Sequence, residues 1–125
     1  MKEKDLKKKL TAKQYNVMRE KGTEMPFTSE LVHNNHAGSY TCAICGTMLF
    51  SSEAKFDSGT GWPSFDKPDN LENIELVKDL SHGMIRTEVI CKKCHSHLGH
   101  VFDDGPTSTG ERYCINGCAL KFKKK

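Results

Sequence analysis

Apolar and polar residues alternate in short segments along most of the chain, and only one segment near the N-terminus has helical spacing. Thr11 followed three residues later by Gln14 has the spacing of a capping box. Glycine is common just after the last turn of a helix, and here it is Gly22. We therefore expect one helix from about Ala12 to Lys21, with Gly22 as its C′ residue.

After Met25-Pro26 the helical period is lost, and short β-branched or aromatic segments alternate with clusters of Gly, Asn, Asp and Ser. This pattern predicts a mostly antiparallel β domain, with a turn at residues 81–83 closing one hairpin. The candidate strands are Ser39 to Thr41, Thr47 to Phe50, Ile74 to Lys78, Met84 to Val89, His97 to Phe102 and Arg112 to Phe122.

The length and composition of the chain predict a single globular domain over residues 1–125. With 125 residues the chain can form one core, and 36% hydrophobic and 28% charged residues are ordinary values for a folded protein. Most of the net charge of +3 comes from lysines in residues 1–10 and 121–125. We expect solvated lysine-rich tails at 1–10 and 122–125, and no nucleic-acid binding.

The sequence predicts neither membrane insertion nor export. No stretch approaches the roughly 18 consecutive apolar residues of a spanning helix, and the lysine-rich start has no apolar core of a signal peptide. Glu3 and Asp5 among these lysines are untypical of a mitochondrial presequence. We expect a cytoplasmic protein.

Four of the six cysteines form two Cys-x-x-Cys pairs, Cys42 with Cys45 and Cys91 with Cys94. Each pair can aim two thiols at one ion, and together they supply a full tetrahedral set. Four thiolates leave no coordination position open, so we expect one structural zinc ion per chain, with iron as the alternative. His95 follows the second pair, but four thiols already complete the site.

Cys114 and Cys118 remain free to react, because metal-bound thiolates are already engaged. Arg112 and Asn116 each lie two residues from Cys114, so on a strand all three side chains share a face. The positive charge of Arg112 would favour the Cys114 thiolate, and Asn116 would donate a hydrogen bond in the same pocket. These residues are our candidates for a reactive site.

Two further motifs carry groups suited to such a site. His97 and His100 offer imidazoles that can deliver a proton near neutral pH. Trp62 lies in a turn rich in Gly and Pro, and taken by itself it is better explained as a core or packing residue.

Together these motifs resemble the B-type methionine sulfoxide reductases, over a match that runs from about Thr11 to Phe122. The motifs are Gly-Trp-Pro-Ser-Phe at 61–65, the paired Cys-x-x-Cys, His-Leu-Gly-His-Val-Phe at 97–102 with Asp-Gly-Pro at 104–106, and Arg-Tyr-Cys-Ile-Asn at 112–116. Each is short, but their order and spacing are specific.

The resemblance implies a fold of two antiparallel sheets, sometimes called a β-tent, and an enzyme that reduces the R epimer of methionine sulfoxide in the repair of oxidative damage. It implies Cys114 as the nucleophile and Trp62 and Phe102 as the residues that hold the S-methyl group of the substrate. The residues that bind or protonate the sulfoxide oxygen would be His97, His100, Arg112 and Asn116.

Attack by Cys114 would leave a sulfenic acid that another thiol must resolve. Many family members carry a resolving cysteine in the middle of the Gly-x-Gly before the tryptophan, where this chain has Thr60. On an extended strand Cys118 would lie about 13 Å from Cys114, beyond the roughly 7 Å limit between Cα atoms for a disulfide. We therefore expect thioredoxin or a small thiol to attack the sulfenic acid directly.

Two other functions stay open at this point. A zinc-bound β module could bind a protein or nucleic acid without catalysis, although this leaves the Cys114 motif unexplained. A Cys–His hydrolase is the other alternative, although no third orienting group is evident. We expect a monomer, and the choice between free and protein-bound methionine sulfoxide stays open.

Overall fold

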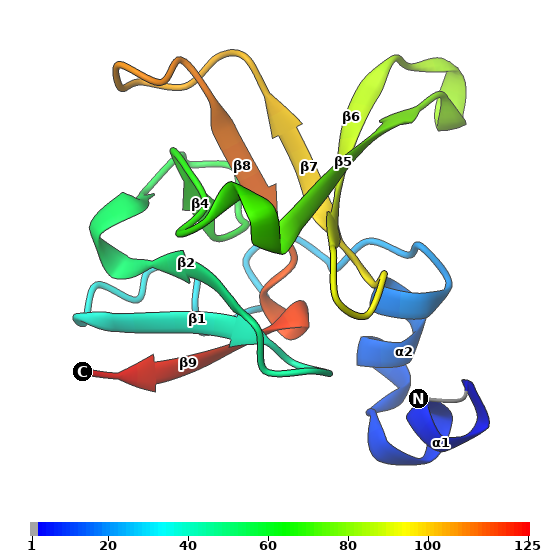
Figure 1. The fold of residues 1–125 in the computed structure, drawn as a ribbon. Helices are drawn as coiled ribbons and strands as arrows, with labels where there is room; N and C mark the ends of the chain where they lie inside the picture. The colour runs from blue at the N-terminus through cyan, green and yellow to red at the C-terminus, as the bar shows by residue number, and fades with distance from the viewer. Residues whose placement is uncertain (1–2) are drawn as a thin grey trace.

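The computed structural model describes residues 3–125 as a mainly β chain with two antiparallel sheets and two short helices near the N-terminus (Figure 1). The predicted fold class is therefore confirmed. Met1 and Lys2, the start of the predicted N-terminal tail, lie outside the described residues. Within residues 3–125, no helix has the length and apolar content needed to cross a membrane.

Helix α2 (Ala12–Arg19) begins at the predicted capping box. The Gln14 N–H donates to Thr11 Oγ1 at 3.1 Å, and the Thr11 N–H donates to Gln14 Oε1 at 3.1 Å. Two backbone N–H groups that have no partner within the helix are thereby hydrogen-bonded, which explains why the helix starts here.

The predicted end of this helix is wrong, because the helix stops at Arg19 and the residue in the left-handed conformation is Lys21, with φ 58°. Gly22 instead lies where the backbone passes close to Asn16. A Cβ atom at Gly22 would lie 1.9 Å from Asn16 Oδ1, and the Gly22 N–H donates to the Asn16 carbonyl at 2.9 Å. Glycine is needed here for space rather than for a positive φ.

The lysine-rich ends carry secondary structure and are not plain solvated tails. Residues 3–9 form helix α1 (Glu3–Lys9), whose Leu6 is buried, and residues 122–124 belong to strand β9 (Leu120–Lys124). The lysine side chains of these segments are exposed, while Leu6 and the partly buried Phe122 pack against the core. These two apolar residues order both ends.

The strands form a three-stranded and a six-stranded antiparallel sheet. The smaller sheet has the order β2 (Met48–Ser51), β1 (Gly38–Cys42), β9. The larger sheet has the order β3 (Lys55–Phe56), β4 (Ser64–Phe65), β8 (Arg112–Ile115), β7 (His97–Phe102), β6 (Arg86–Cys91), β5 (Ile74–Asp79). The predicted turn between β5 and β6 is confirmed as the 3₁₀ turn η3 (Ser81–Gly83). The other 3₁₀ turns are η1 (Ser52–Ala54), η2 (Leu71–Asn73) and η4 (Gly117–Ala119).

The strand predicted from Arg112 to Phe122 is wrong, because the chain breaks at Asn116. Turn η4 carries it from β8 in the larger sheet to β9 in the smaller one, as Figure 1 shows at the orange-to-red end. Gly117 lies against another segment at this crossing, where an added Cβ atom would come within 2.0 Å of Ser29 Oγ. The crossing thus requires a residue without a side chain.

Aromatic packing joins the two sheets. Phe50 of the smaller sheet stacks on Phe65 of the larger one with ring centroids 4.3 Å apart, and Tyr40 meets the same ring edge-on at 5.0 Å. These rings are completely buried. Fully burying a side chain of this size stabilises a fold by about 1.5–3 kcal/mol. Tyr113 lies against Phe50 from β8, so the core directly supports the strand that carries Cys114.

Candidate active site and metal centre

The side chains of strand β8 alternate between the core and the pocket. Tyr113 and Ile115 are buried, while Arg112 and Cys114 between them are only half-buried. Successive side chains on a strand point to opposite faces, so Arg112 and Cys114 point away from the core. Pairing of β8 with β4 and β7 on either side holds Cys114 in the middle of the larger sheet.

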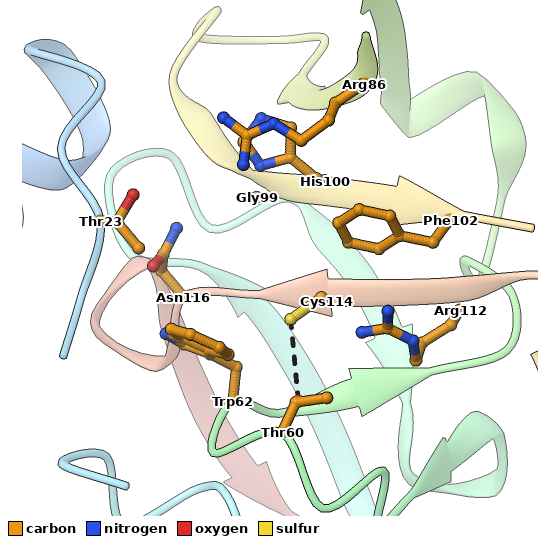
Figure 2. Close-up of a pocket in the computed structure, with 10 residues that line it drawn as sticks. All are labelled: Thr23, Thr60, Trp62, Arg86, Gly99, His100, Phe102, Arg112, Cys114 and Asn116. Atoms are coloured by element: carbon orange, nitrogen blue, oxygen red, sulfur yellow. Dashed lines mark hydrogen bonds between the residues drawn. The ribbon is translucent and has the colours of Figure 1, made fainter. Parts of the chain in front are cut away.

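A pocket of about 230 Å³ opens over Cys114 (Figure 2). Its volume lies just below the roughly 300–1,000 Å³ of cofactor sites, and it suits a single side chain. The lining residues are Thr23, Thr60, Trp62, Arg86, Gly99, His100, Phe102, Arg112, Cys114 and Asn116. Six of the seven residues that we predicted for catalysis and substrate binding are therefore brought together. His97 is absent from this lining.

Polar groups approach the Cys114 sulfur from two sides. Thr60 Oγ1 lies 4.0 Å from Cys114 Sγ and is itself held at 2.7 Å by the Ser58 hydroxyl. Burial raises the pKa of Cys114, while the hydrogen bond of Thr60 and the positive charge of Arg112 oppose that rise. Arg112 acts in the predicted direction, but burial outweighs it.

Arg112 is fixed from two directions. Its Nε and Nη2 donate to the Asp104 carboxylate at 2.9 and 3.2 Å, and its guanidinium lies 4.5 Å from the Phe102 ring centroid. A planar guanidinium suits both a bidentate carboxylate and an aromatic face. Phe102 therefore forms a wall of the pocket and a support for Arg112.

A β-bulge places the two predicted histidines on the same side of β7. The register shifts between Val89 and Ile90, so that Val89 faces Gly99 while Ile90 faces His97. Leu98 is thus an extra residue in β7. It brings the centroids of the His97 and His100 rings to 5.4 Å from each other, although side chains three residues apart on a regular strand point to opposite faces. His100 lines the pocket, and His97 is buried beside it.

Each histidine binds a carboxylate. His97 Nδ1 lies 2.7 Å from Glu88 Oε2, and His100 Nε2 lies 2.7 Å from Asp79 Oδ2. Burial lowers the pKa of His97 although Glu88 opposes this shift. The hydrogen bond from His100 holds the pKa of Asp79 well below its usual range. The carboxylates fix both ring orientations.

A cation lies beside each of these two carboxylates. Lys21 Nζ lies 3.4 Å from Glu88 Oε1, and Arg86 Nη2 lies 3.6 Å from Asp79 Oδ2. Glu88 is buried, so the ion pair and the hydrogen bond from His97 offset the cost of its desolvation. The two carboxylates and their cations thus fix the His100 ring at the pocket and the His97 ring behind it.

Trp62 and Asn116 are held by the backbone of one residue, Glu24. The indole Nε1 of Trp62 donates to the Glu24 carbonyl at 2.8 Å, and the Glu24 N–H donates to Asn116 Oδ1 at 2.9 Å. Asn116 Nδ2 donates to the Leu98 carbonyl at 2.9 Å, which leaves one amide hydrogen for the pocket. Asn116 lines the pocket from the N-cap of η4 and not from a strand.

Cys118 lies outside the pocket lining. Our distance of about 13 Å assumed an extended strand, and this basis is wrong because residues 117–119 form η4. Cys118 is half-buried against the core, and burial raises the pKa of its thiol to about 12. A thiol in this state is a poor nucleophile near neutral pH.

The predicted metal ligands converge at the junction of the two sheets. The four sulfur atoms of Cys42, Cys45, Cys91 and Cys94 all lie within 4.8 Å of one another, with Cys42–Cys94 at 3.6 Å and Cys45–Cys91 at 3.5 Å. Tetrahedral sulfur ligands at 2.3 Å from a zinc ion would be about 3.8 Å apart. The cluster therefore fits a metal ion held by four thiolates.

The two Cys-x-x-Cys turns have the same backbone form. The N–H of Gly46 donates to the Cys42 carbonyl at 2.9 Å, and the N–H of His95 donates to the Cys91 carbonyl at 2.7 Å. Gly46 and His95 both have positive φ, 78° and 60°. The exposed His95 ring lies near Glu75, so His95 shapes the turn without joining the ligand set.

Helix α2 adds a cation to this metal cluster. Arg19 Nη1 donates to the Cys94 carbonyl at 3.0 Å and to Ser96 Oγ at 3.1 Å, and the same guanidinium pairs with Glu3 of α1. A positive group beside four thiolates favours their charged form. The N-terminal helices thus support the metal centre.

Sequence reasoning missed the residues that hold the site together. These are the acidic partners Glu24, Asp79, Glu88 and Asp104 and the pocket residues Thr23 and Arg86. A charged residue in a polar stretch gives no signal that it is buried or paired. Glu88 pairs with His100 across β6 and β7, so it lies on the same face of the sheet as His100 and Cys114.

Comparison with known proteins places this architecture in a family. The sequence-family model for the SelR domain matches residues 10–124. Peptide methionine sulfoxide reductase MsrB of Leptospira interrogans is 56% identical over 121 residues, 97% of this chain and 92% of the relative. The proteins of that name from Bradyrhizobium diazoefficiens and Methanosarcina barkeri are 56% and 55% identical, over 98% and 97% of this chain and 88% and 85% of theirs. The chain therefore belongs to the SelR domain family, to which the resemblance in its motifs pointed.

Proposed function

We propose that this protein is an oxidoreductase that reduces the R epimer of methionine sulfoxide with Cys114 as its nucleophile. One observation carries the proposal: a free thiol lies in a pocket of side-chain size with an imidazole, a guanidinium, an amide and an indole. The names of the relatives support the same reaction class. Residues 1–125 would act as one catalytic domain.

The reaction transfers one oxygen atom between two sulfur atoms. The Cys114 sulfur attacks the sulfoxide sulfur, the S–O bond of the substrate breaks, and methionine leaves. The oxygen and the thiol proton end on Cys114 as a sulfenic acid. The sulfur of methionine is reduced and that of Cys114 is oxidised, so atoms and electrons balance.

Each pocket residue has a part in this step. His100 would donate a proton or hydrogen bond to the sulfoxide oxygen, with His97 holding the proton network behind it, because the sulfoxide sulfur becomes electrophilic only when its oxygen is neutralised. Arg112 would favour the thiolate, and the free amide hydrogen of Asn116 would bind the oxygen. Trp62 and Phe102 would hold the S-methyl group.

An external thiol would regenerate Cys114. The residue nearest the Cys114 sulfur in the Gly-x-Gly turn is Thr60, and Cys118 is half-buried with a raised pKa. Thioredoxin or a small thiol would attack the sulfenic sulfur, releasing water and leaving a mixed disulfide, and a second thiol would then restore Cys114. We infer that the protein acts as a monomeric, cytoplasmic repair enzyme in oxidative stress.

The four-cysteine cluster would hold one structural zinc ion. Its closed set of four thiolates fits zinc best and leaves no position for substrate. When bound, the ion would tie β1 of the smaller sheet to β6 of the larger one, and take no part in the reaction.

The test measures methionine formation from separately supplied R and S sulfoxides with dithiothreitol as reductant. Wild type should convert the R epimer only, and Cys114→Ser should convert neither. Zinc content and circular dichroism should be the same for both proteins. If folded, zinc-loaded wild type converts neither epimer, the proposed function is wrong, and a non-catalytic binding module becomes the better explanation.

A further inference from the structure

Glu24 is a buried acid between α2 and β1, only 3% exposed, and the reaction described above does not use it. Its carboxylate binds the turn that follows the catalytic strand. Oε1 accepts the N–H of Gly117 at 2.8 Å, and Oε2 accepts the N–H of Cys118 at 3.1 Å. Lys13 Nζ lies 3.1 Å from Oε2 and supplies the balancing charge.

The backbone of the same residue binds two side chains that line the pocket. Its carbonyl accepts the indole N–H of Trp62, and its N–H donates to the side chain of Asn116. Thr23, the preceding residue, lines the pocket itself. In Figure 2, Trp62, Asn116 and Thr23 lie on the same side of the pocket, at the end of β8 beyond Cys114.

Charge-assisted hydrogen bonds from two consecutive amides fix a carboxylate more firmly than neutral bonds do. The side chain of Glu24 thus fixes its own backbone against η4, and that backbone in turn fixes Trp62 and Asn116. No contact of this carboxylate reaches Cys114 or the histidines among the hydrogen bonds and ion pairs within residues 3–125. Its effect on the site is therefore on substrate placement.

We propose that Glu24 is a positioning residue that sets where Trp62 and Asn116 stand relative to Cys114. The proposal rests on the proposed function for its kinetic readout. It also has an independent readout, because the chain contains one tryptophan and its fluorescence reports on Trp62 alone.

The variants are Glu24→Gln, Glu24→Ala and Glu24→Asp, with Lys13→Met as the matched control. Glutamine keeps the volume, but its amide nitrogen cannot accept the Cys118 N–H, so Gln and Ala should both release the turn. Aspartate keeps both acceptors on a shorter stem and should rescue part of the function. Lys13→Met removes the ion pair with Glu24 and a long hydrogen bond to Thr28, but it keeps both backbone hydrogen bonds of the Glu24 carboxylate to η4. It should therefore change kcat/KM by less than about twofold.

Misplacement of a substrate by about 1 Å can cost up to 10²-fold in rate. Glu24→Gln should therefore lower kcat/KM for the R sulfoxide by about 10-fold or more, mainly through KM. It should also shift the emission maximum of Trp62 and increase its quenching by acrylamide. The rate of Cys114 alkylation by iodoacetamide should stay close to that of wild type, because the Glu24 carboxylate contacts Lys13, Gly117 and Cys118 in the described part of the chain and not this thiol.

A folded, zinc-loaded Glu24→Gln with the kcat/KM and Trp62 emission of wild type would overturn the proposal. So would failure of all three Glu24 variants to fold, since Glu24 would then be a structural residue only. If wild type makes no methionine, the proposed function fails. The emission and quenching of Trp62 still decide whether Glu24 positions the Trp62 side chain.

Discussion

The metal centre and the Cys114 pocket both depend on cysteine, but they surround the sulfur atom in opposite ways. The four sulfur atoms of the metal centre lie within 4.8 Å of one another at the junction of two sheets. Cys114 has no sulfur neighbour among the residues that line its pocket, and meets a hydroxyl, a guanidinium and an indole there. Clustered thiols hold an ion, whereas a single thiol among donors is available to react.

The two regions also use charge differently. Arg19 faces the metal centre through a carbonyl and a hydroxyl, and it supports four thiolates at once. Arg112 shares its charge between Asp104 and Cys114, and so only partly offsets the effect of burial on the thiol. The metal centre should therefore determine stability, and the pocket should determine rate.

The largest effect should come from removing a metal ligand. Cys42→Ser should lower the free energy of unfolding by more than about 4 kcal/mol, because a structural metal contributes its binding energy to folding. Urea unfolding followed by circular dichroism, with zinc content measured in parallel, checks this. Chelation of wild type should reproduce the effect. Metal-free protein as stable as wild type would refute the structural role.

Arg112→Met should affect the rate more than the stability. Loss of the guanidinium raises the pKa of Cys114 further and should lower kcat/KM at pH 7 by about 10²-fold, as loss of one charged donor does in other enzymes. Alkylation of Cys114 as a function of pH, in a Cys118→Ser background, measures the pKa. Asp104→Asn is the matched control and should shift this pKa downward, because the Asp104 charge raises it. Equal shifts in the same direction would contradict this account.

The His97–Glu88 pair should give a smaller, pH-dependent effect. Because burial lowers the pKa of His97 below 6.5, the unfolded chain takes up this proton first as the pH falls. Stability should therefore decrease as the pH drops from 7 through 6.5 toward the folded pKa. Glu88→Gln should lower the pKa of His97 further, since the carboxylate favours the imidazolium. Proton NMR titration decides, and a His97 pKa above 6.5 in wild type would contradict the prediction.

The smallest effect should follow Cys118→Ser. This thiol lies outside the pocket lining, so thioredoxin-dependent turnover should stay within about twofold, a change below 0.5 kcal/mol in activation energy. Steady-state assays with thioredoxin and with dithiothreitol check this. A variant that makes one equivalent of methionine but loses thioredoxin-dependent turnover would show that Cys118 resolves the sulfenic acid.

The fold was predictable where the signal is local. The capping box at Thr11 starts a helix, the β-branched and aromatic segments between turn residues give β1, β5 and β7, and the paired cysteines give the metal cluster. The break at Asn116 was not predictable, since an apolar run on both sides of Gly117 looks like one strand. Only the close approach of Ser29 reveals why the chain turns there.

The site was predictable as a set of reactive groups but not as an arrangement. Cys114, Arg112 and His100 follow from residue type and spacing. The bulge in β7 that brings His97 beside His100 depends on pairing with β6, which no local pattern encodes. Glu24 is far in sequence from η4, the turn that follows β8, so its buried contacts with that turn appear only in three dimensions.

The most direct test of the separation between the two regions is to find which sulfur carries the oxygen. One equivalent of methionine R-sulfoxide is added to zinc-loaded protein without reductant, dimedone traps sulfenic acid, and peptide mass spectrometry locates the adduct. We expect one adduct on Cys114, with zinc retained and Cys42, Cys45, Cys91 and Cys94 unmodified. An adduct on a metal ligand or on Cys118, or release of zinc in step with methionine formation, would contradict the assignment of chemistry to Cys114 alone.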